Sequence, residues 1–282
     1  MRILVVPNAA NPRSVTAAGL VCARLAAMGY EPVLLAADAD ASDLASFGVA
    51  HADIGTPELA VALGGDGTIL KAVHLLGPST VPILGINLGR LGFLSGADGG
   101  ELVAALESAL AGEGKVERRQ TIEASVSMGG RSVGVYRALN EVFVGRGGGS
   151  RGVELAIDVN GQRLAQYVCD GVIVATPTGS TAYALSAGGP LVSPEVRGMV
   201  LLPVAAHALG VRPMVLGPCD AVRISCPNSA RADAGVSVDG DQVPARSALD
   251  AVEVKVGEHD VHLLRLDGRD FYGTLARTFL GG

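Results

Sequence analysis

Residues 59–68, LAVALGGDGT, decide the fold of the first part of the chain. The apolar run 59–63 predicts a buried strand, and the glycines after it lead into a helix that ends at Leu76. A glycine-rich turn at a helix N-terminus presents backbone N–H groups and partial positive charge to a phosphate. Asp66 repels an anion, so we interpret it as a base, a hydroxyl ligand or a metal contact beside the phosphate. A tight turn with an aspartate cap is the alternative.

The residues around this stretch continue an alternation of strand and helix. Strands are predicted at 3–7, 31–36 and 81–86, and a helix begins at Ser14 and is stopped by Gly29. This alternation is typical of a parallel sheet in an α/β layer.

Later in the chain the pattern changes to short strands and tight turns. The alternating residues 153–159 are followed by Asn160-Gly161, a strong hairpin signal, and Asp239-Gly240 repeats the same device. The segments 252–256 and 261–266 are predicted to form a further pair of strands. We therefore expect the second part to be β-rich.

Composition excludes several classes of protein. The 282 residues carry a net charge of −6 and 4% aromatic residues with no Trp, which argues against binding to nucleic acid. No apolar run approaches the roughly 18 residues of a membrane-spanning helix, and the first residues do not form a secretion signal. We therefore expect a cytoplasmic protein that does not bind membranes. The four cysteines form no C-x-x-C pair and are expected to be reduced and mostly buried: Cys22, Cys169, Cys219 and Cys226.

A second candidate site lies at residues 176–183, TPTGSTAY, after the apolar run 172–175. Five of these eight residues carry hydroxyls, which can bind a phosphate, a ribose or a base edge without adding charge. A helix N-cap needs only one hydroxyl, so the density favours a ligand. Asn140-Glu141 and Asp170-Gly171 also stand at strand ends. Adjacent Asn and Glu can accept hydrogen bonds from a ribose diol, but either pair alone is more often a turn.

Two familiar nucleotide-binding patterns are not met. Gly147, Gly149 and Gly152 match G-x-G-x-x-G, but a strand follows them where the dinucleotide motif needs a helix. The phosphate-binding pattern Gly-Lys-Ser/Thr does not occur, because Gly114-Lys115 is followed by Val116.

Taken in chain order, the motifs resemble those of the bacterial NAD kinase family. They are GGDGT at 64–68, GINLGRLGFL at 85–94, Asn140-Glu141, and the stretch 170–190. The first is shared with diacylglycerol, sphingosine and phosphofructo-type kinases, whereas the last is much more specific to NAD kinases. The resemblance covers nearly the whole chain.

The resemblance implies a fold with an α/β N-terminal domain and a β-rich, β-sandwich C-terminal domain, with NAD bound between them. The first would comprise residues 1–97 joined by the C-terminal segment 267–282, and the second residues 98–266. It also implies a homo-oligomer, a dimer or a tetramer. Val168 departs from the family pattern where many members carry a basic residue, which weakens one expected contact between protomers.

The resemblance also implies residue roles. Asp66 would be the catalytic base, within a phosphate-donor loop that also contains Gly64, Gly65, Gly67 and Thr68. The residues implied to contact NAD are Asp66, Gly67, Asn140, Glu141, Arg151, Asp170, Thr181, Ala182, Tyr183, Ala184, Leu185, Ser186 and Gln242. No protein metal ligand is assigned, and Mg²⁺ or another divalent ion is expected to accompany ATP.

The implied reaction transfers a phosphoryl group from ATP or polyphosphate to the 2′-hydroxyl of the adenosine ribose of NAD, giving NADP. Two alternatives stay open at this point. One is a lipid or sugar kinase that shares only the GGDGT loop, and the other is a sensor that binds NAD without turnover.

Overall fold

A computed structural model describes residues 1–279 except 42, 90–91, 148–151, 208–209, 228–233, 245–246, 267 and 269. The chain divides into two units. The first unit is Met1–Arg118 with Val261–Gly282, and the second is Arg119–Asp260. The sequence placed the corresponding boundaries at 97/98 and 266/267. The structure divides the chain elsewhere because the segment after residue 97 and the last strand both contribute to the first unit.

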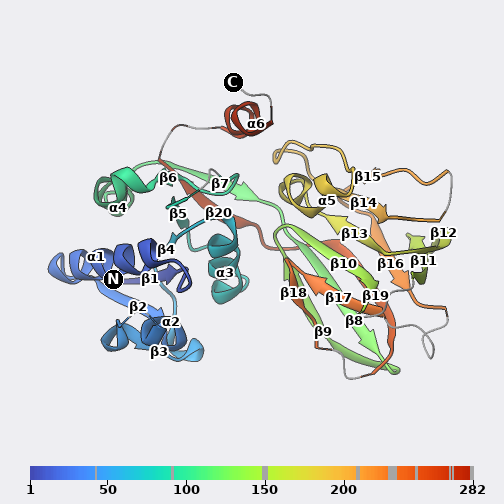
Figure 1. Ribbon diagram of the computed structural model, residues 1–282, viewed down its shortest axis with the longest axis horizontal. Coiled ribbons are helices and arrows are strands. Elements are labelled where there is room, and N and C mark those ends of the chain that lie inside the picture. The colour runs from blue at the N-terminus through green and yellow to red at the C-terminus, as the bar shows by residue number, and fades with distance from the viewer. Residues whose placement is uncertain are drawn as a thin grey trace. The chain divides into compact units, whose positions relative to one another are not determined.

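An eight-stranded sheet forms the centre of the first unit, in the order β3-β2-β1-β4-β5-β20-β7 with β6 beside β5 (Figure 1). Its strands are β1 Arg2–Pro7, β2 Glu31–Leu35, β3 Gly48–Val49, β4 Leu59–Leu63, β5 Ile83–Asn87, β6 Ala97–Asp98, β7 Lys115–Arg119 and β20 Val261–Arg265. Its helices are α1 Pro12–Ala27, α2 Ala36–Ala41, α3 Asp66–Leu76, α4 Leu102–Leu110 and α6 Phe271–Phe279. The strands β2, β1, β4, β5 and β20 run parallel. This confirms the predicted α/β layer.

Helices cover both faces of this sheet. Side chains of α1 and α4 share a buried cluster with Leu84 and Ile86 of β5. Gly85, between them, faces the other way, where a Cβ atom would lie 2.4 Å from Ile69 of α3. Because these strands are buried on both faces, their sequences are continuous apolar runs and do not alternate between apolar and polar residues.

The strand order changes direction at β1: β2 pairs with β1 on one side, and β4 pairs with it on the other. In open parallel sheets, ligands bind at the carboxyl ends of the strands at such a reversal. Here that place is the end of β1 and β4, where the GGDGT turn begins.

One predicted strand pairing is wrong. The segments 252–256 and 261–266 do not pair with each other, because β19 (Leu249–Val256) pairs with β8 (Ile122–Met128) and β16 (Ala221–Ser225) in the second unit. β20 instead lies parallel to β5, with Leu263 opposite Ile83. Its apolar residues are buried in the interior of a parallel sheet, which strand periodicity alone does not reveal.

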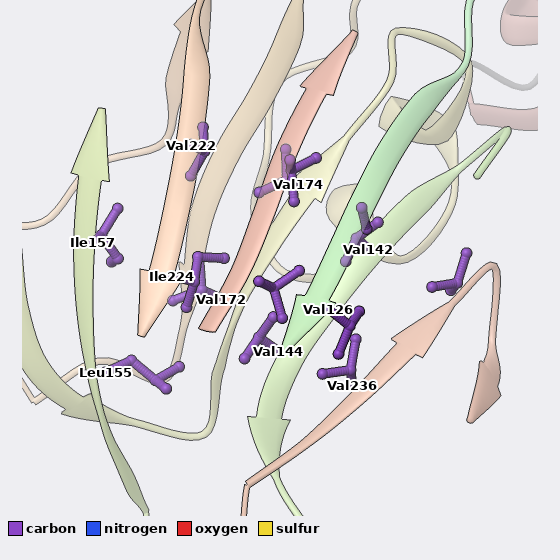
Figure 2. Close-up of a cluster of buried hydrophobic side chains, with 14 of the residues drawn as sticks. Val126, Val142, Val144, Leu155, Ile157, Val172, Val174, Val222, Ile224 and Val236 are labelled. Atoms are coloured by element: carbon purple, nitrogen blue, oxygen red, sulfur yellow. The ribbon is translucent and has the colours of Figure 1, made fainter. Parts of the chain in front are cut away.

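The second unit is a sandwich of two six-stranded sheets, in the orders β15-β14-β13-β10-β17-β18 and β12-β11-β16-β19-β8-β9. Its other strands are β8 Ile122–Met128, β9 Arg131–Ala138, β10 Glu141–Arg146, β11 Val153–Val159, β12 Gln162–Cys169, β13 Gly171–Ala175, β14 Met199–Val204, β15 Met214–Leu216, β16 Ala221–Ser225, β17 Ala234–Val238 and β18 Asp241–Gln242. Figure 2 shows Val142 and Val172 of one sheet in the same core as Val126 and Ile224 of the other. The predicted β-sandwich is confirmed.

Both predicted hairpin turns are present. Asn160 and Gly161 have φ of 52° and 77°, and Asp239 and Gly240 have φ of 50° and 90°. Two consecutive residues with positive φ are what a type I′ hairpin turn needs, which explains why Gly stands second in each.

Cys22, Cys169 and Cys226 are buried and Cys219 is exposed, and all four are free thiols. Burial raises the pKa of the three buried thiols to about 11, 12 and 11 respectively, so they stay protonated and pack as small apolar groups. Within the described ranges, no helix is long and apolar enough to cross a membrane.

Candidate active site

The first cluster is the GGDGT turn between β4 and α3. A Cβ atom on Gly64 would lie 2.3 Å from Oγ1 of Thr68, so the turn closes only with glycine there. A Cβ atom on Gly65 or Gly67 would meet nothing within 4 Å, so their backbone borders open space at the N-terminus of an eleven-residue helix. This arrangement suits a phosphate, which can approach the backbone closely.

The Asp66 carboxylate is held against the backbone that follows β5. Its Oδ2 accepts a hydrogen bond from the N–H of Phe93 at 2.9 Å, and its Oδ1 accepts one from the N–H of Leu94 at 3.2 Å. A Cβ atom on Gly92 would lie 2.1 Å from Oδ1, so only glycine allows this contact. Asp66 is only partly buried. The turn therefore presents an oriented carboxylate that a ligand can still reach.

The sequence reasoning missed the loop after β1. The buried hydroxyl of Ser14 accepts from the N–H of Asn8 at 2.8 Å and donates to the carbonyl of Leu63 at 2.6 Å. It thereby ties the ends of β1 and β4 together beside the GGDGT turn. A signal was available, because Asn11 followed by Pro12, a short loop after an apolar strand, is a helix start.

The second cluster joins Asn140-Glu141 to the 176–183 turn in the second unit. The N–H of Thr176 donates to the carbonyl of Asn140 at 2.8 Å, and its hydroxyl donates to the carbonyl of Leu139 at 2.5 Å. A Cβ atom on Gly179 would lie 2.1 Å from the Asn140 carbonyl oxygen. Two segments about 35 residues apart are thus packed backbone to backbone, which local patterns do not show.

Most hydroxyls of this turn bond to the protein itself. Ser180 donates to the Pro177 carbonyl at 2.6 Å and accepts from the N–H of Val192 at 3.0 Å. Thr181 donates to the carbonyl of Thr178 at 3.0 Å. The hydroxyls therefore build the 3₁₀ turn Thr178–Thr181 and the short helix α5, Tyr183–Ser186, rather than all facing a ligand. The candidate residues Ala182, Ala184, Leu185 and Ser186 lie at or within that helix, and Tyr183 is exposed with its ring 5.6 Å from that of Phe143.

Glu141 has an unusual electrostatic environment. It is 8% exposed, one of its oxygens accepts from the backbone N–H of Tyr183, and Oε2 is buried without a hydrogen-bond partner. Burial, and after it the nearby Asp239 carboxylate, raise the pKa of this carboxyl from 4.5 to about 7, and the Tyr183 amide opposes part of the rise. A buried polar atom without a partner is rare in proteins and points to a missing hydrogen-bond donor.

Asp239 is a site residue that sequence reasoning missed. Its carboxylate accepts hydrogen bonds from the backbone N–H groups of Leu139, Asn140 and Glu141 at 2.8, 2.7 and 3.1 Å. It therefore fixes the backbone that carries the Asn-Glu pair. The sequence showed Asp239 only as a hairpin turn residue, because these contacts span about 100 residues.

Asp170 lies apart from this cluster. Asp170 forms an ion pair with Arg146 at 3.3 Å. It sits at the opposite end of the β10–β13 pair from Glu141, about five residues or roughly 16 Å along the strand. Gln242 is exposed on β18, opposite Ser237 of β17. Arg151 lies outside the described residues.

Similarity to known proteins covers both units. Residues 23–114 match the ATP-NAD kinase N-terminal domain and residues 139–266 match the ATP-NAD kinase C-terminal domain. An NAD kinase of Heliobacterium modesticaldum is 41% identical over 218 residues, 77% of each chain. An NAD kinase of Symbiobacterium thermophilum is 37% identical over 282 aligned residues, 97% of each chain. The chain belongs to the NAD kinase family.

Solved structures of NAD kinase relatives have the same fold. The yeast NADH kinase complexed with NADH superposes with a TM-score of 0.89 at 27% identity, covering all of this chain and 87% of the yeast chain. An NAD kinase from Archaeoglobus fulgidus in complex with ATP gives a TM-score of 0.72 at 27% identity, over 100% and 98% of the two chains. Because the match extends far beyond the GGDGT loop, it favours an NAD kinase over a lipid or sugar kinase.

Proposed function

We propose that this protein is an NAD kinase that transfers the terminal phosphoryl group of ATP to the 2′-hydroxyl of the adenosine ribose of NAD, giving NADP. Besides family membership, the observation that carries the proposal is Oε2 of Glu141, a buried carboxylate oxygen without a hydrogen-bond partner. A ribose hydroxyl supplies the donor that this oxygen lacks. A phosphate in the same place would be repelled.

Asp66 is assigned the role of general base. A ribose hydroxyl is a weak nucleophile at neutral pH, and removal of its proton as the new bond forms contributes about 10² to 10⁴ in rate. The two backbone N–H groups that hold the carboxylate fix its orientation and leave it partly exposed. Positioning and charge neutralisation supply the rest of the rate.

The backbone of Gly65 and Gly67 is assigned to the donor phosphates. Mg²⁺ or another divalent ion enters with ATP as part of the substrate. No group of three or more His, Cys, Asp or Glu residues suited to a metal ion occurs among the residues that the structure describes. Polyphosphate carries the same chemical group as the ATP tail and remains a second candidate donor.

We further propose that the protein is a homo-oligomer. β12 and β15 are each one of the two edge strands of their sheet, and each exposes apolar side chains: Leu164, Val168, Met214 and Val215 are 45%, 39%, 38% and 57% exposed. A cavity of about 460 Å³ lined by Leu164, Tyr167 and Met214 lies between these edges. A second copy would cover the edges and their apolar side chains. Light scattering at micromolar concentration should give a dimer or tetramer, and a fully active monomer would overturn this part of the proposal.

A cytoplasmic location stays a prediction.

The test of the activity is to mix the protein with NAD, ATP and Mg²⁺ and to measure NADP with an NADP-specific dehydrogenase. The proposal expects NADP and ADP to form in equal amounts. NAD binding without turnover would support the sensor alternative, and phosphorylation of diacylglycerol but not of NAD would support the lipid kinase alternative. Replacing ATP with polyphosphate in the same assay identifies the donor.

A further inference from the structure

Arg265 is a buried arginine at the end of β20, and each of its three guanidinium nitrogens has a partner in the first unit. Nε donates to Oε2 of Glu117 at 3.1 Å, Nη2 donates to the carbonyl of Phe93 at 2.7 Å, and Nη1 donates to the carbonyl of Ser95. The residue is 8% exposed. The planar fork of the guanidinium therefore grips the backbone of residues 93–95 at two points.

That grip is transmitted to Asp66 through one peptide group. The carbonyl of Phe93 and the N–H of Leu94 belong to the same planar unit and point in opposite directions. The carbonyl accepts from Arg265, and the N–H donates to Oδ1 of Asp66. A rotation of this peptide that broke one hydrogen bond would break the other as well. Each bond also polarises the next, which strengthens both.

The C-terminal segment fixes the same loop in two further ways. The N–H of Leu266 donates to the carbonyl of Gly96 at 3.0 Å. The ring of Phe93 lies 6.0 Å from that of Phe271 and 5.9 Å from that of Phe279, both in α6. The loop that clamps Asp66 is therefore held from the C-terminal part of the chain by Arg265, Leu266 and two rings of α6.

A contribution to the stability of the fold does not by itself explain why an arginine is buried at position 265. Burying an ion pair costs desolvation energy that its attraction often does not recover, and apolar replacements of similar size are often neutral or stabilising. The Arg265–Glu117 pair has side chains 9% and 20% exposed. What an apolar residue cannot supply is two directed donors for the carbonyls of the loop.

We propose that Arg265 is a positioning residue for the reaction: it fixes the Phe93–Leu94 peptide so that the Asp66 carboxylate stays aimed at the substrate hydroxyl. The inference rests on the proposed role of Asp66 as base. It assigns a catalytic consequence to the return of the chain's C-terminal segment to the first sheet.

The test compares Arg265→Met and Arg265→Lys with the wild-type protein, with Arg24→Met as the control. Arg24 also forms an ion pair in the first unit, with Glu107, but on the exposed surface. Because small misplacements of a reacting group cost up to about 100-fold in rate, we expect Arg265→Met to lower kcat by about tenfold or more. The KM values for NAD and ATP should change less than about threefold. Arg265→Lys keeps the charge beside Glu117 and one donor for the loop, so it should fold and regain part of the lost kcat. The control should match wild type.

A double-mutant cycle separates positioning from general structural support. If Arg265 acts through Asp66, Arg265→Met should lower kcat much less in an Asp66→Asn background than in wild type. Equal losses in both backgrounds, or an unchanged kcat in folded Arg265→Met, would overturn the inference. If Arg265→Met does not fold, an unchanged kcat in Arg265→Lys would overturn it as well. Near wild-type turnover of Asp66→Asn alone would instead overturn the proposed base, so the two failures are distinguishable.

Discussion

Replacing Glu141 with Gln should make the protein more stable at alkaline pH. Glu141 is buried, and its folded-state pKa is raised from an ordinary 4.5 to about 7, first by burial and then by Asp239. Since each pH unit of difference is worth about 1.4 kcal/mol, ionisation of Glu141 costs the folded state about 3 kcal/mol at pH 8. Gln has nearly the same shape, can still accept from the Tyr183 N–H, and never ionises.

The sign of the pH dependence follows from the two pKa values. Below about pH 4.5 the carboxyl is neutral in both the folded and the unfolded state, so Glu141→Gln and wild type should be equally stable. As pH rises from 4.5 to 7, the unfolded state loses its proton before the folded state does, and the wild type is progressively destabilised. Above pH 7 the difference should be constant at about 3 kcal/mol in favour of Gln.

The assay is urea denaturation followed by circular dichroism at pH 4.5, 6, 7 and 8, without nucleotide. Glu195→Gln is the matched control, because Glu195 lies exposed in the same unit, and its variant should differ from wild type by less than about 0.5 kcal/mol at every pH. A difference between Glu141→Gln and wild type that does not vary with pH would refute the reasoning. It would mean that water reaches Oε2 in the free protein.

The other predictions concern the two clusters. Glu141→Ala should raise the KM for NAD by about tenfold or more, since a lost partner of a buried group costs about 1–3 kcal/mol. The same substitution should weaken inhibition by NADP less than it weakens binding of NAD, and an unchanged KM for NAD with unchanged inhibition by NADP would remove Glu141 from the site. Asp239→Ala leaves three backbone N–H groups without their acceptor, so it should lower the free energy of unfolding by about 2–4 kcal/mol and raise the KM for NAD. A loss of unfolding free energy below about 0.5 kcal/mol in urea denaturation would contradict the anchoring role. Gly92→Ala places a methyl group 2.1 Å from the Asp66 carboxylate and should lower kcat about tenfold or more in the NADP assay, whereas full activity would show that the clamp is dispensable.

Local patterns were enough to predict the elements nearest the site. The β4–α3 turn and the Asn160-Gly161 and Asp239-Gly240 hairpins depend on residues adjacent in the chain, and all three are confirmed. Such signals are reliable because only glycine or a short polar residue fits the backbone there.

Contacts between distant segments were not predictable in the same way. β20 has the apolar pattern of a hairpin strand, and only the structure shows that it joins β5, about 180 residues earlier. The hydrogen bonds of Asp239 and of Arg265 likewise join segments 98 to 172 residues apart. Asp239 acts on the backbone that carries Asn140 and Glu141, and Arg265 acts on the loop that holds Asp66, so periodicity in the sequence gave no sign of either residue.

The most direct test of the account is the turnover of Asp66→Asn at saturating NAD and ATP. The substitution keeps the size of the side chain and an oxygen that can accept from the loop, but removes the base. We predict a loss of kcat of about 100-fold or more, with NAD affinity, measured by calorimetry, changed much less. NADP formation by Asp66→Asn at a rate near that of the wild type would contradict the account.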